Sequence, residues 1–211
     1  MANPYRLYGW SGSGSVAVQI ALEEGGLPYE RIWVGKEPAA LDAYRRINPT
    51  GKVPALVLPD GTVMAESAAM LIHLAAAHPQ AQLAPQPGTS RHALFLQWMV
   101  FLSANVYEAV LRIYYADRYV PAGAAAGAAD AVRERGTADY VSFLELLAGS
   151  LGPYVLGDAW SVADPYLYML GSWSPLDKDT LYARIPALGV HAARVGARAA
   201  VVRVEADHAT P

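Results

Sequence analysis

The first part of the chain carries short apolar segments whose spacing predicts alternating strands and helices. Residues 6–8 form an apolar and aromatic run that ends at Gly9, which is typical of a strand. From Val16 to Glu24 the apolar residues recur at helical spacing, and Gly25-Gly26 ends the run. Residues 32–34 then begin a second strand. Because a strand, helix, strand unit almost always crosses over right-handedly, we expect these two strands to be parallel.

The segment that follows predicts a short helix, a β-hairpin and a longer helix. Residues 41–47 suit a helix, and residues 55–64 suit two strands joined by the tight turn Pro59-Asp60-Gly61. Helical spacing resumes over residues 67–78, and Pro79 ends it. The resulting order of strands and helices, βαβαββα, is that of the thioredoxin-like α/β fold.

The remainder of the chain predicts an all-α helical bundle. A proline-containing stretch with linker composition follows Pro79, and no convincing strand alternation comes after it. We therefore expect a thioredoxin-like domain at residues 1–79, a linker at residues 80–89 and an all-α domain at residues 90–211. The helices predicted for the second domain lie within residues 90–116, 130–151, 161–173 and 185–195.

Composition narrows the classes of partner and the location. The 211-residue chain is 54% apolar and 17% charged, and its formal net charge is −3. This balance gives no strongly basic face, so we expect no nucleic-acid partner. The start Met1-Ala2-Asn3-Pro4 lacks the profile of a signal peptide, and no uncharged apolar run approaches the roughly 18 residues of a membrane span. We therefore expect a cytoplasmic protein that does not enter a membrane.

Cysteine and histidine usage limits the chemistry further. The chain has no cysteine, so any thiol chemistry must use a thiol that a ligand brings. Its five histidines are scattered without metal-ligand spacing, and we expect no metal site.

Two segments next to the predicted hairpin suit the binding of an amino acid or peptide. Pro54 removes a backbone donor and can adopt the cis form, which would turn the amide and carbonyl of Val53 toward a ligand backbone. Ser67 can cap the helix that starts there, and a helix start binds carboxylate, while the Glu66 side chain suits an ammonium group. The alternatives are a plain turn at Pro54 and an ordinary helix cap at Ser67.

Taken together, these segments resemble the glutathione transferase superfamily. The resemblance rests on Tyr8-Gly9, the serine and glycine turn after it, residues 48–56, Glu66-Ser67 and the all-helical second half, and it covers essentially the whole chain. It implies that Val53 makes main-chain contacts to the cysteinyl part of glutathione, with Pro54 cis. It also implies that Glu66 and Ser67 hold the γ-glutamyl end and that Lys52 reaches the glycine carboxylate.

A second match lies in the helical half, at Gly157-Asp158 and residues 160–164. Ser161 and Asp164 form a capping box, so we assign Asp164 to folding. The continuation toward Trp173 resembles bacterial, beta-related members of the superfamily. The beta class places a cysteine near Gly14 and a histidine near Tyr107, and both are missing here. This difference excludes a mixed disulfide with glutathione and favours activation of its thiolate.

The resemblance also implies a residue that favours the thiolate form of glutathione. Aligned from the strand, Ser13 falls where serine-type members place the hydroxyl that bonds the sulfur, and it is our first choice. Aligned from the helix, the position falls at Gly12, so Ser11 competes with Ser13, and Ser15 is third. The alternative is that all three serines merely cap the helix.

The electrophile is expected to contact aromatic side chains. Candidates are Tyr107, Tyr114, Tyr115 and Trp173 in the helical domain and Trp10 in the first domain, although aromatic residues at helical spacing also fill cores and interfaces. The resemblance therefore implies a homodimeric glutathione transferase that conjugates glutathione, its co-substrate, to a small hydrophobic electrophile. The alternatives are a glutathione-binding or interaction protein without turnover and, last, a glutathione-dependent isomerase.

Overall fold

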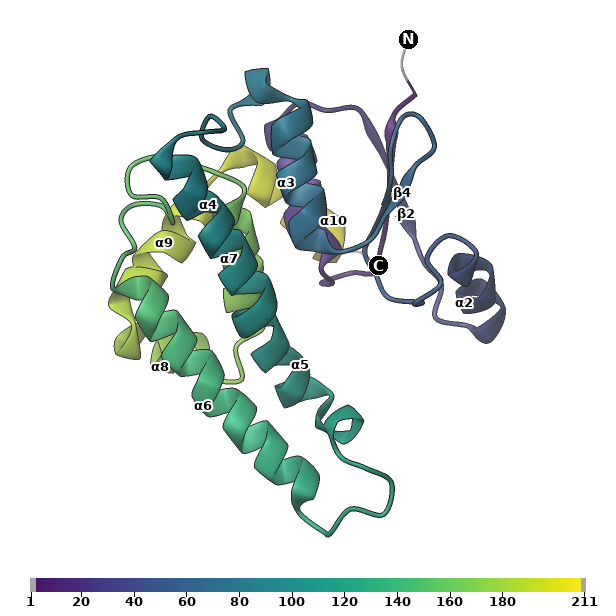
Figure 1. Cartoon of the computed structure of the whole chain (residues 1–211), viewed down its shortest axis with the longest axis vertical. Coiled ribbons are helices and arrows are strands. Elements are labelled where there is room, and N and C mark those ends of the chain that lie inside the picture. Colours follow the sequence, from purple (N-terminus) through teal and green to yellow (C-terminus); the bar gives the residue numbers. More distant parts are fainter. Residues whose placement is uncertain (1–2, 210–211) are drawn as a thin grey trace. The chain divides into compact units, whose positions relative to one another are not determined.

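The computed structural model describes residues 3–209. Met1, Ala2, Thr210 and Pro211 lie outside the described residues, and with them the outer ends of the two expected domains. The chain divides into two compact units (Figure 1). The first unit is Met1–Pro87 with Gly196–Pro211, and the second is Gly88–Val195.

The first unit contains a four-stranded sheet in the order β2-β1-β3-β4. The first two strands are parallel, as predicted, and β3 pairs antiparallel with both β1 and β4. The strands are β1 (Tyr5–Gly9), β2 (Tyr29–Trp33), β3 (Ala55–Val57) and β4 (Val63–Met64), and the helices between and after them are α1 (Ser15–Glu24), α2 (Pro38–Arg45) and α3 (Ser67–Ala77). A short 3₁₀ turn, Pro79–Ala81, follows α3. The predicted thioredoxin-like order is confirmed.

The core of this unit is formed by the inner strands and by α1. Leu7 of β1 and Leu56 of β3 have no exposed surface, and residues 17–22 of α1 are all buried. α1 packs against β1 and α3, whose Leu71 and Leu74 are also fully buried. These contacts anchor β1, β3, α1 and α3 in one apolar core.

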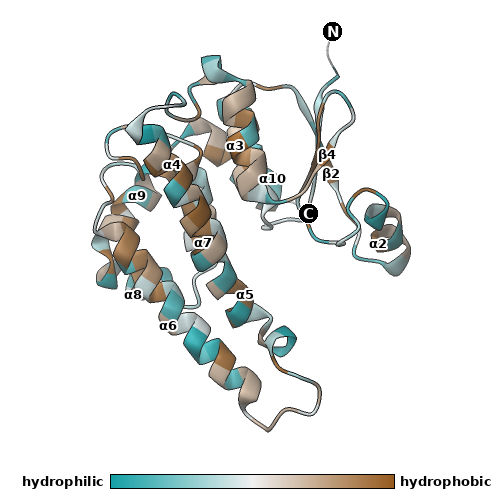
Figure 2. Cartoon of the chain, in the orientation of Figure 1, coloured by the Kyte–Doolittle hydropathy of each residue, from teal (hydrophilic) through white to brown (hydrophobic). Residues whose placement is uncertain are grey.

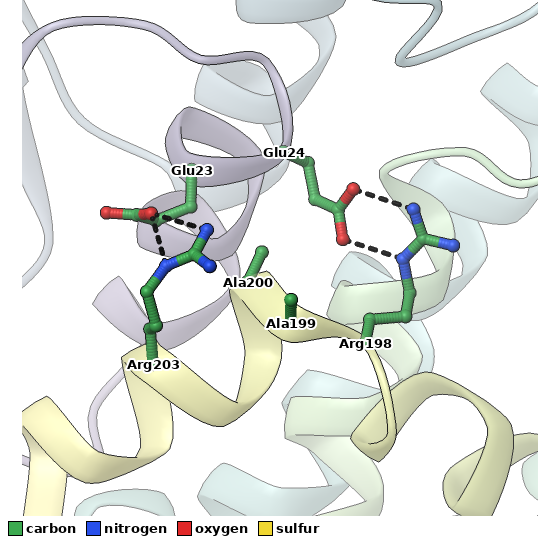
Figure 3. Close-up of a pocket in the computed structure, with 6 residues that line it drawn as sticks. All are labelled: Glu23, Glu24, Arg198, Ala199, Ala200 and Arg203. Atoms are coloured by element: carbon green, nitrogen blue, oxygen red, sulfur yellow. Dashed lines mark hydrogen bonds and ion pairs between the residues drawn. The ribbon is translucent and has the colours of Figure 1, made fainter.

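The end of the chain differs from the expectation. The predicted all-α domain included all residues from 90 to 211, but helix α10 (Ala199–Ala209) belongs to the first unit and packs against α1. Two ion pairs join these helices: Arg198 to Glu24 at 2.6 Å and Arg203 to Glu23 at 3.0 Å (Figure 3). The four charged side chains line a pocket together with Ala199 and Ala200. Because both arginines are paired with carboxylates, this pocket offers no unpaired charge to a ligand.

The second unit is helical, as predicted. The helix expected over residues 90–116 forms in pieces, with a π turn at Leu102–Tyr107 that the sequence did not predict. A short helix after Trp173 was also not predicted. The helices are α4 (Ser90–Phe101), α5 (Glu108–Tyr114), α6 (Ala128–Ala148), α7 (Ala163–Ser172), α8 (Lys178–Arg184) and α9 (Pro186–Gly196), and a 3₁₀ turn covers Ala116–Tyr119.

The helical run Ser90–Tyr114 is long and apolar enough to cross a membrane, by length and composition only. A core helix gives the same pattern, and 33% of its most apolar stretch is buried inside the protein. Phe95 and Met99 of α4 face the core, whereas Leu94 and Val100 are exposed. Figure 2 shows brown, apolar residues along the α4 ribbon. α4 thus has one apolar face in the core and a second apolar face at the surface.

Candidate functional site

The strand register brings the three predicted ligand segments to one end of the sheet. Tyr8 lies opposite Ala55 in the β1–β3 pair, and Leu56 lies opposite Met64 in the β3–β4 pair. Because both pairs are antiparallel, the residues just before β3 lie beside those just after β1 and those just after β4. Three segments therefore meet there: Val53-Pro54, Glu66-Ser67 and the serine loop, residues 10–15, which follows Gly9.

The peptide bond between Val53 and Pro54 is cis, as the resemblance implied. Pro54 is buried and Val53 is half-buried. The amide and carbonyl of Val53 make no hydrogen bond with any other described residue. The site thus has main-chain groups at Val53 that a ligand backbone can pair with, and the Lys52 side chain beside them is exposed.

The loop before Val53 is held by side chains behind it. The Lys52 carbonyl accepts hydrogen bonds from the Tyr44 hydroxyl at 2.8 Å and from Asn48 Nδ2 at 2.6 Å. Asn48 is 4% exposed, and its Oδ1 accepts bonds from the amide and hydroxyl of Thr50. These bonds fix the backbone on the N-terminal side of Val53.

Glu66 and Ser67 occupy the start of α3. Glu66 holds the N-cap position without a side-chain capping bond, and Ser67 is the first residue of the helix, so the cap predicted at Ser67 lies one residue earlier. Glu66 has a φ of 68°, which costs a non-glycine residue about 1–3 kcal/mol and is found most often at functional sites. Its carboxylate is exposed, whereas Ser67 is 7% exposed.

The serine loop leads from β1 into α1. The Ser13 hydroxyl oxygen accepts a bond from the Trp10 amide at 3.1 Å and lies 2.9 Å from the Ser15 hydroxyl oxygen. Ser13 is partly exposed, whereas Ser15 is 1% exposed and lies behind it. Gly14 holds the N-cap position of α1 without a side-chain bond, and the Ser13 hydroxyl oxygen also accepts from the Ser15 amide, the first of the helix, at 3.4 Å.

Gly9 allows Ser15 to occupy this position. A Cβ atom at Gly9 would lie 2.2 Å from the Ser15 hydroxyl oxygen, a distance that no side chain could tolerate. The sequence analysis treated Gly9 only as the end of a strand, but its lack of a side chain makes room for the paired hydroxyls.

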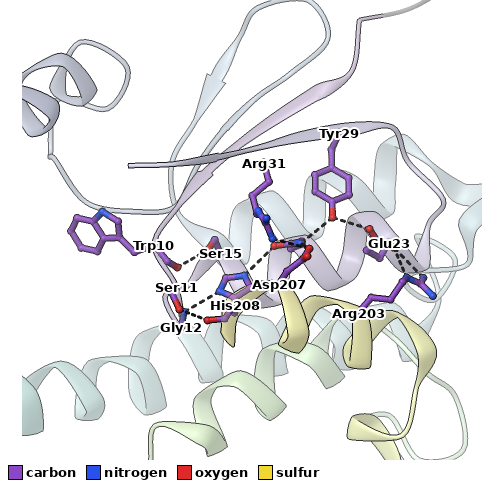
Figure 4. Close-up of polar contacts among 11 residues, drawn as sticks. Trp10, Ser11, Gly12, Ser15, Glu23, Tyr29, Arg31, Arg203, Asp207 and His208 are labelled. Atoms are coloured by element: carbon purple, nitrogen blue, oxygen red, sulfur yellow. Dashed lines mark hydrogen bonds and ion pairs between the residues drawn. The ribbon is translucent and has the colours of Figure 1, made fainter. Parts of the chain in front are cut away.

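Ser11 bonds to His208, a residue that was not predicted as part of the site. Its hydroxyl donates to the backbone carbonyl of His208 in α10, and the Gly12 amide donates to His208 Nδ1 at 2.9 Å (Figure 4). Burial, followed by the nearby charge of Arg31, lowers the pKa of His208 to about 4. The imidazole is therefore neutral at pH 7.

The Trp10 backbone bonds to Ser13, but its side chain stands apart from these contacts. Its ring points away from the cluster around His208 (Figure 4), and its buried indole N–H has no hydrogen-bond partner within residues 3–209.

Three of the aromatic residues predicted for the electrophile gather in the second unit. The rings of Tyr107 and Trp173 meet edge to face at 5.3 Å, and the Tyr114 hydroxyl donates to the Trp173 carbonyl at 3.1 Å. Tyr107 ends the π turn, a feature often found at functional sites. Tyr115 takes no part in this cluster, and the Arg118 guanidinium lies over its ring at 3.9 Å.

Comparison with known proteins agrees with these features. Residues 15–77 match the family model described as the glutathione S-transferase N-terminal domain. The glutathione S-transferase Z2 of Arabidopsis thaliana is 30% identical over 75% of this chain and 70% of its own length. The protein named uncharacterized GST-like protein YncG, from Escherichia coli K12, is 28% identical over 81% of this chain and 82% of its own length. A crystal structure of a glutathione transferase homologue from Sulfitobacter with bound glutathione is 30% identical, with a TM-score of 0.85 over 98% of this chain and 99% of that one.

Proposed function

Because the chain belongs to the glutathione S-transferase family, we propose that it binds glutathione as co-substrate and transfers its thiolate to a small apolar electrophile. The observation that carries the proposal is the meeting of Val53, Glu66-Ser67 and Ser13 at one end of the sheet. The similar Sulfitobacter protein was solved with glutathione bound, which supports the choice of tripeptide. The proposed location is the cytoplasm, where glutathione is the principal thiol buffer.

The charges and main-chain groups of this site match the parts of glutathione. Val53 would pair through its amide and carbonyl with the cysteinyl backbone of the tripeptide. Glu66 would take the ammonium group of the γ-glutamyl end, while Ser67 and the start of α3 would take its carboxylate. The exposed Lys52 would reach the glycine carboxylate. This arrangement leaves the glutathione sulfur near the start of α1.

Ser13 is then the proposed donor to the sulfur. The Ser15 hydroxyl has two acceptors within reach, the Ser13 oxygen at 2.9 Å and the Trp10 carbonyl at 3.4 Å. When it donates to the nearer Ser13 oxygen, which also accepts from the Trp10 amide, the Ser13 proton is left to point at the ligand. A hydrogen bond to the thiolate favours the ionised form and lowers the thiol pKa, and a shift of about 2 units corresponds to roughly 2.7 kcal/mol. The thiol proton leaves to solvent, and the thiolate attacks the electrophilic carbon. In a substitution reaction the leaving group departs with its bonding electrons.

The aromatic cluster of the second unit is the proposed contact for the electrophile. Tyr107, Tyr114 and Trp173 offer ring faces and edges that suit an apolar or aromatic molecule. Trp10 in the first unit is the further candidate.

Glutathione binding tests the proposal directly. We expect titration calorimetry to detect binding of glutathione to the wild-type protein, and Glu66→Gln to weaken it about tenfold, because an amide cannot replace a charge-assisted bond to ammonium. Glu134→Gln in α6, an equally exposed carboxylate, is the matched control and should bind as the wild type does. Equal affinity in both variants would contradict the assignment. Binding without any rate enhancement toward an activated aryl halide would instead favour the glutathione-binding protein without turnover.

The exposed apolar face of α4 is the proposed contact between two copies of the chain. Leu94 is 49% exposed and Val100 is 60% exposed, and both lie on the same helix. We expect Val100→Arg to convert the dimer to a monomer in light scattering, because the charge would be desolvated at the interface. Leu146→Arg on α6 replaces a side chain that is 62% exposed and should leave the mass unchanged. A wild-type monomer, or an unchanged dimer in Val100→Arg, would rule out this face.

A further inference from the structure

His208 lies where three segments of the first unit come together. Its Nδ1 accepts from the Gly12 amide at 2.9 Å, and its Nε2 lies 3.0 Å from Gln19 Oε1 in α1. The Trp33 ring at the end of β2 meets the imidazole edge to face at 4.9 Å. The His208 side chain is 9% exposed, and Figure 4 shows it at α10, beside Ser11 and Gly12 of the serine loop.

The hydrogen bonds define the tautomer of this imidazole. Because the Gly12 amide can only donate, Nδ1 must be the unprotonated nitrogen, and the proton lies on Nε2, from which it is donated to Gln19 Oε1. Gln19 is oriented in turn, since its Nε2 donates to Asp207 at 2.7 Å and to the Tyr29 hydroxyl at 3.0 Å. The unprotonated Nδ1 atom that accepts from Gly12 is therefore kept in place by hydrogen bonds that run from His208 Nε2 through Gln19 to Asp207 and Tyr29.

The His208 imidazole joins the serine loop to α10. Gly12 has a φ of 67°, a conformation that favours glycine, and a Cβ atom there would meet nothing within 4 Å. The Ser11 hydroxyl donates to the His208 carbonyl, and the Gly12 amide donates to His208 Nδ1. Hydrogen bonds to His208 thus hold the two residues directly before Ser13, while the bonds between Trp10 and Ser13 hold the turn itself.

We propose that His208 is a positioning residue for the thiolate-stabilising serine, acting through the bond between its Nδ1 and the Gly12 amide. This inference rests on the proposed function, since it assumes that the Ser13 hydroxyl faces the glutathione sulfur. The last helix of the chain would then be part of the catalytic machinery even though it does not touch the substrate.

Two substitutions of the same residue separate positioning from simple packing. In His208→Asn the amide oxygen takes the place of Nδ1 and still accepts from Gly12, but the bond to Gln19 is lost. In His208→Gln the amide takes the place of Nε2 and still reaches Gln19, but the acceptor for Gly12 is lost. We expect His208→Gln to lower kcat toward an activated aryl halide about fivefold to tenfold, with little change in the KM for glutathione, because one hydrogen bond is lost. His208→Asn should stay close to the wild type.

Two further measurements accompany the kinetics. The pKa of the bound glutathione thiol, followed by the ultraviolet absorbance of the thiolate, should rise in His208→Gln and stay unchanged in His208→Asn. Hydrogen exchange at the Gly12 amide should be slow in the wild type and in His208→Asn, and faster in His208→Gln. This exchange measurement needs no substrate.

The outcomes distinguish the two proposals. Equal losses of kcat in both variants, matched by equal losses in melting temperature, would show a structural role and overturn the inference. Fast exchange at Gly12 in the wild type would overturn it as well. A wild-type protein that neither binds glutathione nor enhances the reaction would overturn the proposed function, whatever the exchange at Gly12 shows.

Discussion

Replacing Ser13 with alanine is expected to lower kcat/KM for glutathione addition by about 10- to 100-fold, because a charge-assisted hydrogen bond to the thiolate is worth about 1.5–3 kcal/mol. The backbone of Val53 and the Glu66 carboxylate are untouched, so the affinity for glutathione should change little. The thiol pKa should rise, which lowers the thiolate fraction near neutral pH. The loss of rate should therefore be largest at low pH and shrink once the pH exceeds the raised thiol pKa.

Neighbouring serines serve as controls for this variant. Ser13→Thr keeps the hydroxyl and should keep most of the rate. Ser15→Ala removes the donor behind Ser13 and should cost less, about threefold to tenfold, since a neutral hydrogen bond is worth about 1 kcal/mol. If Ser13→Ala keeps the full rate at every pH while Ser11→Ala or Ser15→Ala loses it, the assignment moves to that neighbour.

Much of the fold could be predicted because local signals agree with the tertiary structure. Gly25-Gly26 and Pro79 end helices that the apolar spacing already indicated, and the turn at residues 59–61 fixes the hairpin. That hairpin then determines which residues flank β3, so the meeting of Val53 with Glu66-Ser67 follows from strand register and could be anticipated from the sequence.

The contacts of α10 could not be predicted in this way. Its buried residues Val201, Val204 and His208 have helical spacing, but spacing alone does not say which unit the helix packs on. That choice depends on partners about 175 positions away in the sequence, such as Glu24, which pairs with Arg198. No local pattern records such a pairing. His208 was accordingly grouped with scattered histidines, although it bonds to the serine loop.

The π turn at Leu102–Tyr107 was missed for a different reason. The segment carries apolar residues on more than one side, so its spacing over residues 90–116 still resembles a continuous helix when one turn is widened by a residue. The clustering of Tyr107 with Trp173 depends on tertiary packing between segments 66 positions apart, and could only be suggested from the sequence by resemblance.

The capping box predicted at the start of α7 forms only in part: Asp164 accepts from the Ser161 amide, but Val162 holds the N-cap position and the Ser161 hydroxyl accepts from the Ala163 amide at 3.3 Å. Asp164 and His191 have no exposed surface. One oxygen of Asp164 accepts from the Val155 amide at 2.7 Å and lies 3.0 Å from His191 Nε2, and the other accepts from the Ser161 amide at 2.8 Å. A single side chain thus satisfies donors from three parts of the second unit, which agrees with the role in folding that the sequence predicted.

Asp164→Ala is expected to destabilise the protein by about 3–5 kcal/mol, because it leaves two backbone amides and an imidazole donor buried without an acceptor. This is a large part of the roughly 5–15 kcal/mol that stabilises a typical domain, so the urea midpoint should fall sharply. Asp130→Ala is the matched control: it also removes a paired carboxylate, here one paired with Arg133, but its side chain is 71% exposed, and the loss should stay below about 1 kcal/mol. In a His191→Leu background the cost of Asp164→Ala should be smaller, since one buried donor is already gone. A midpoint for Asp164→Ala as high as that of Asp130→Ala would mean that water or rearranged backbone satisfies these donors, and that the carboxylate does not hold the second unit together.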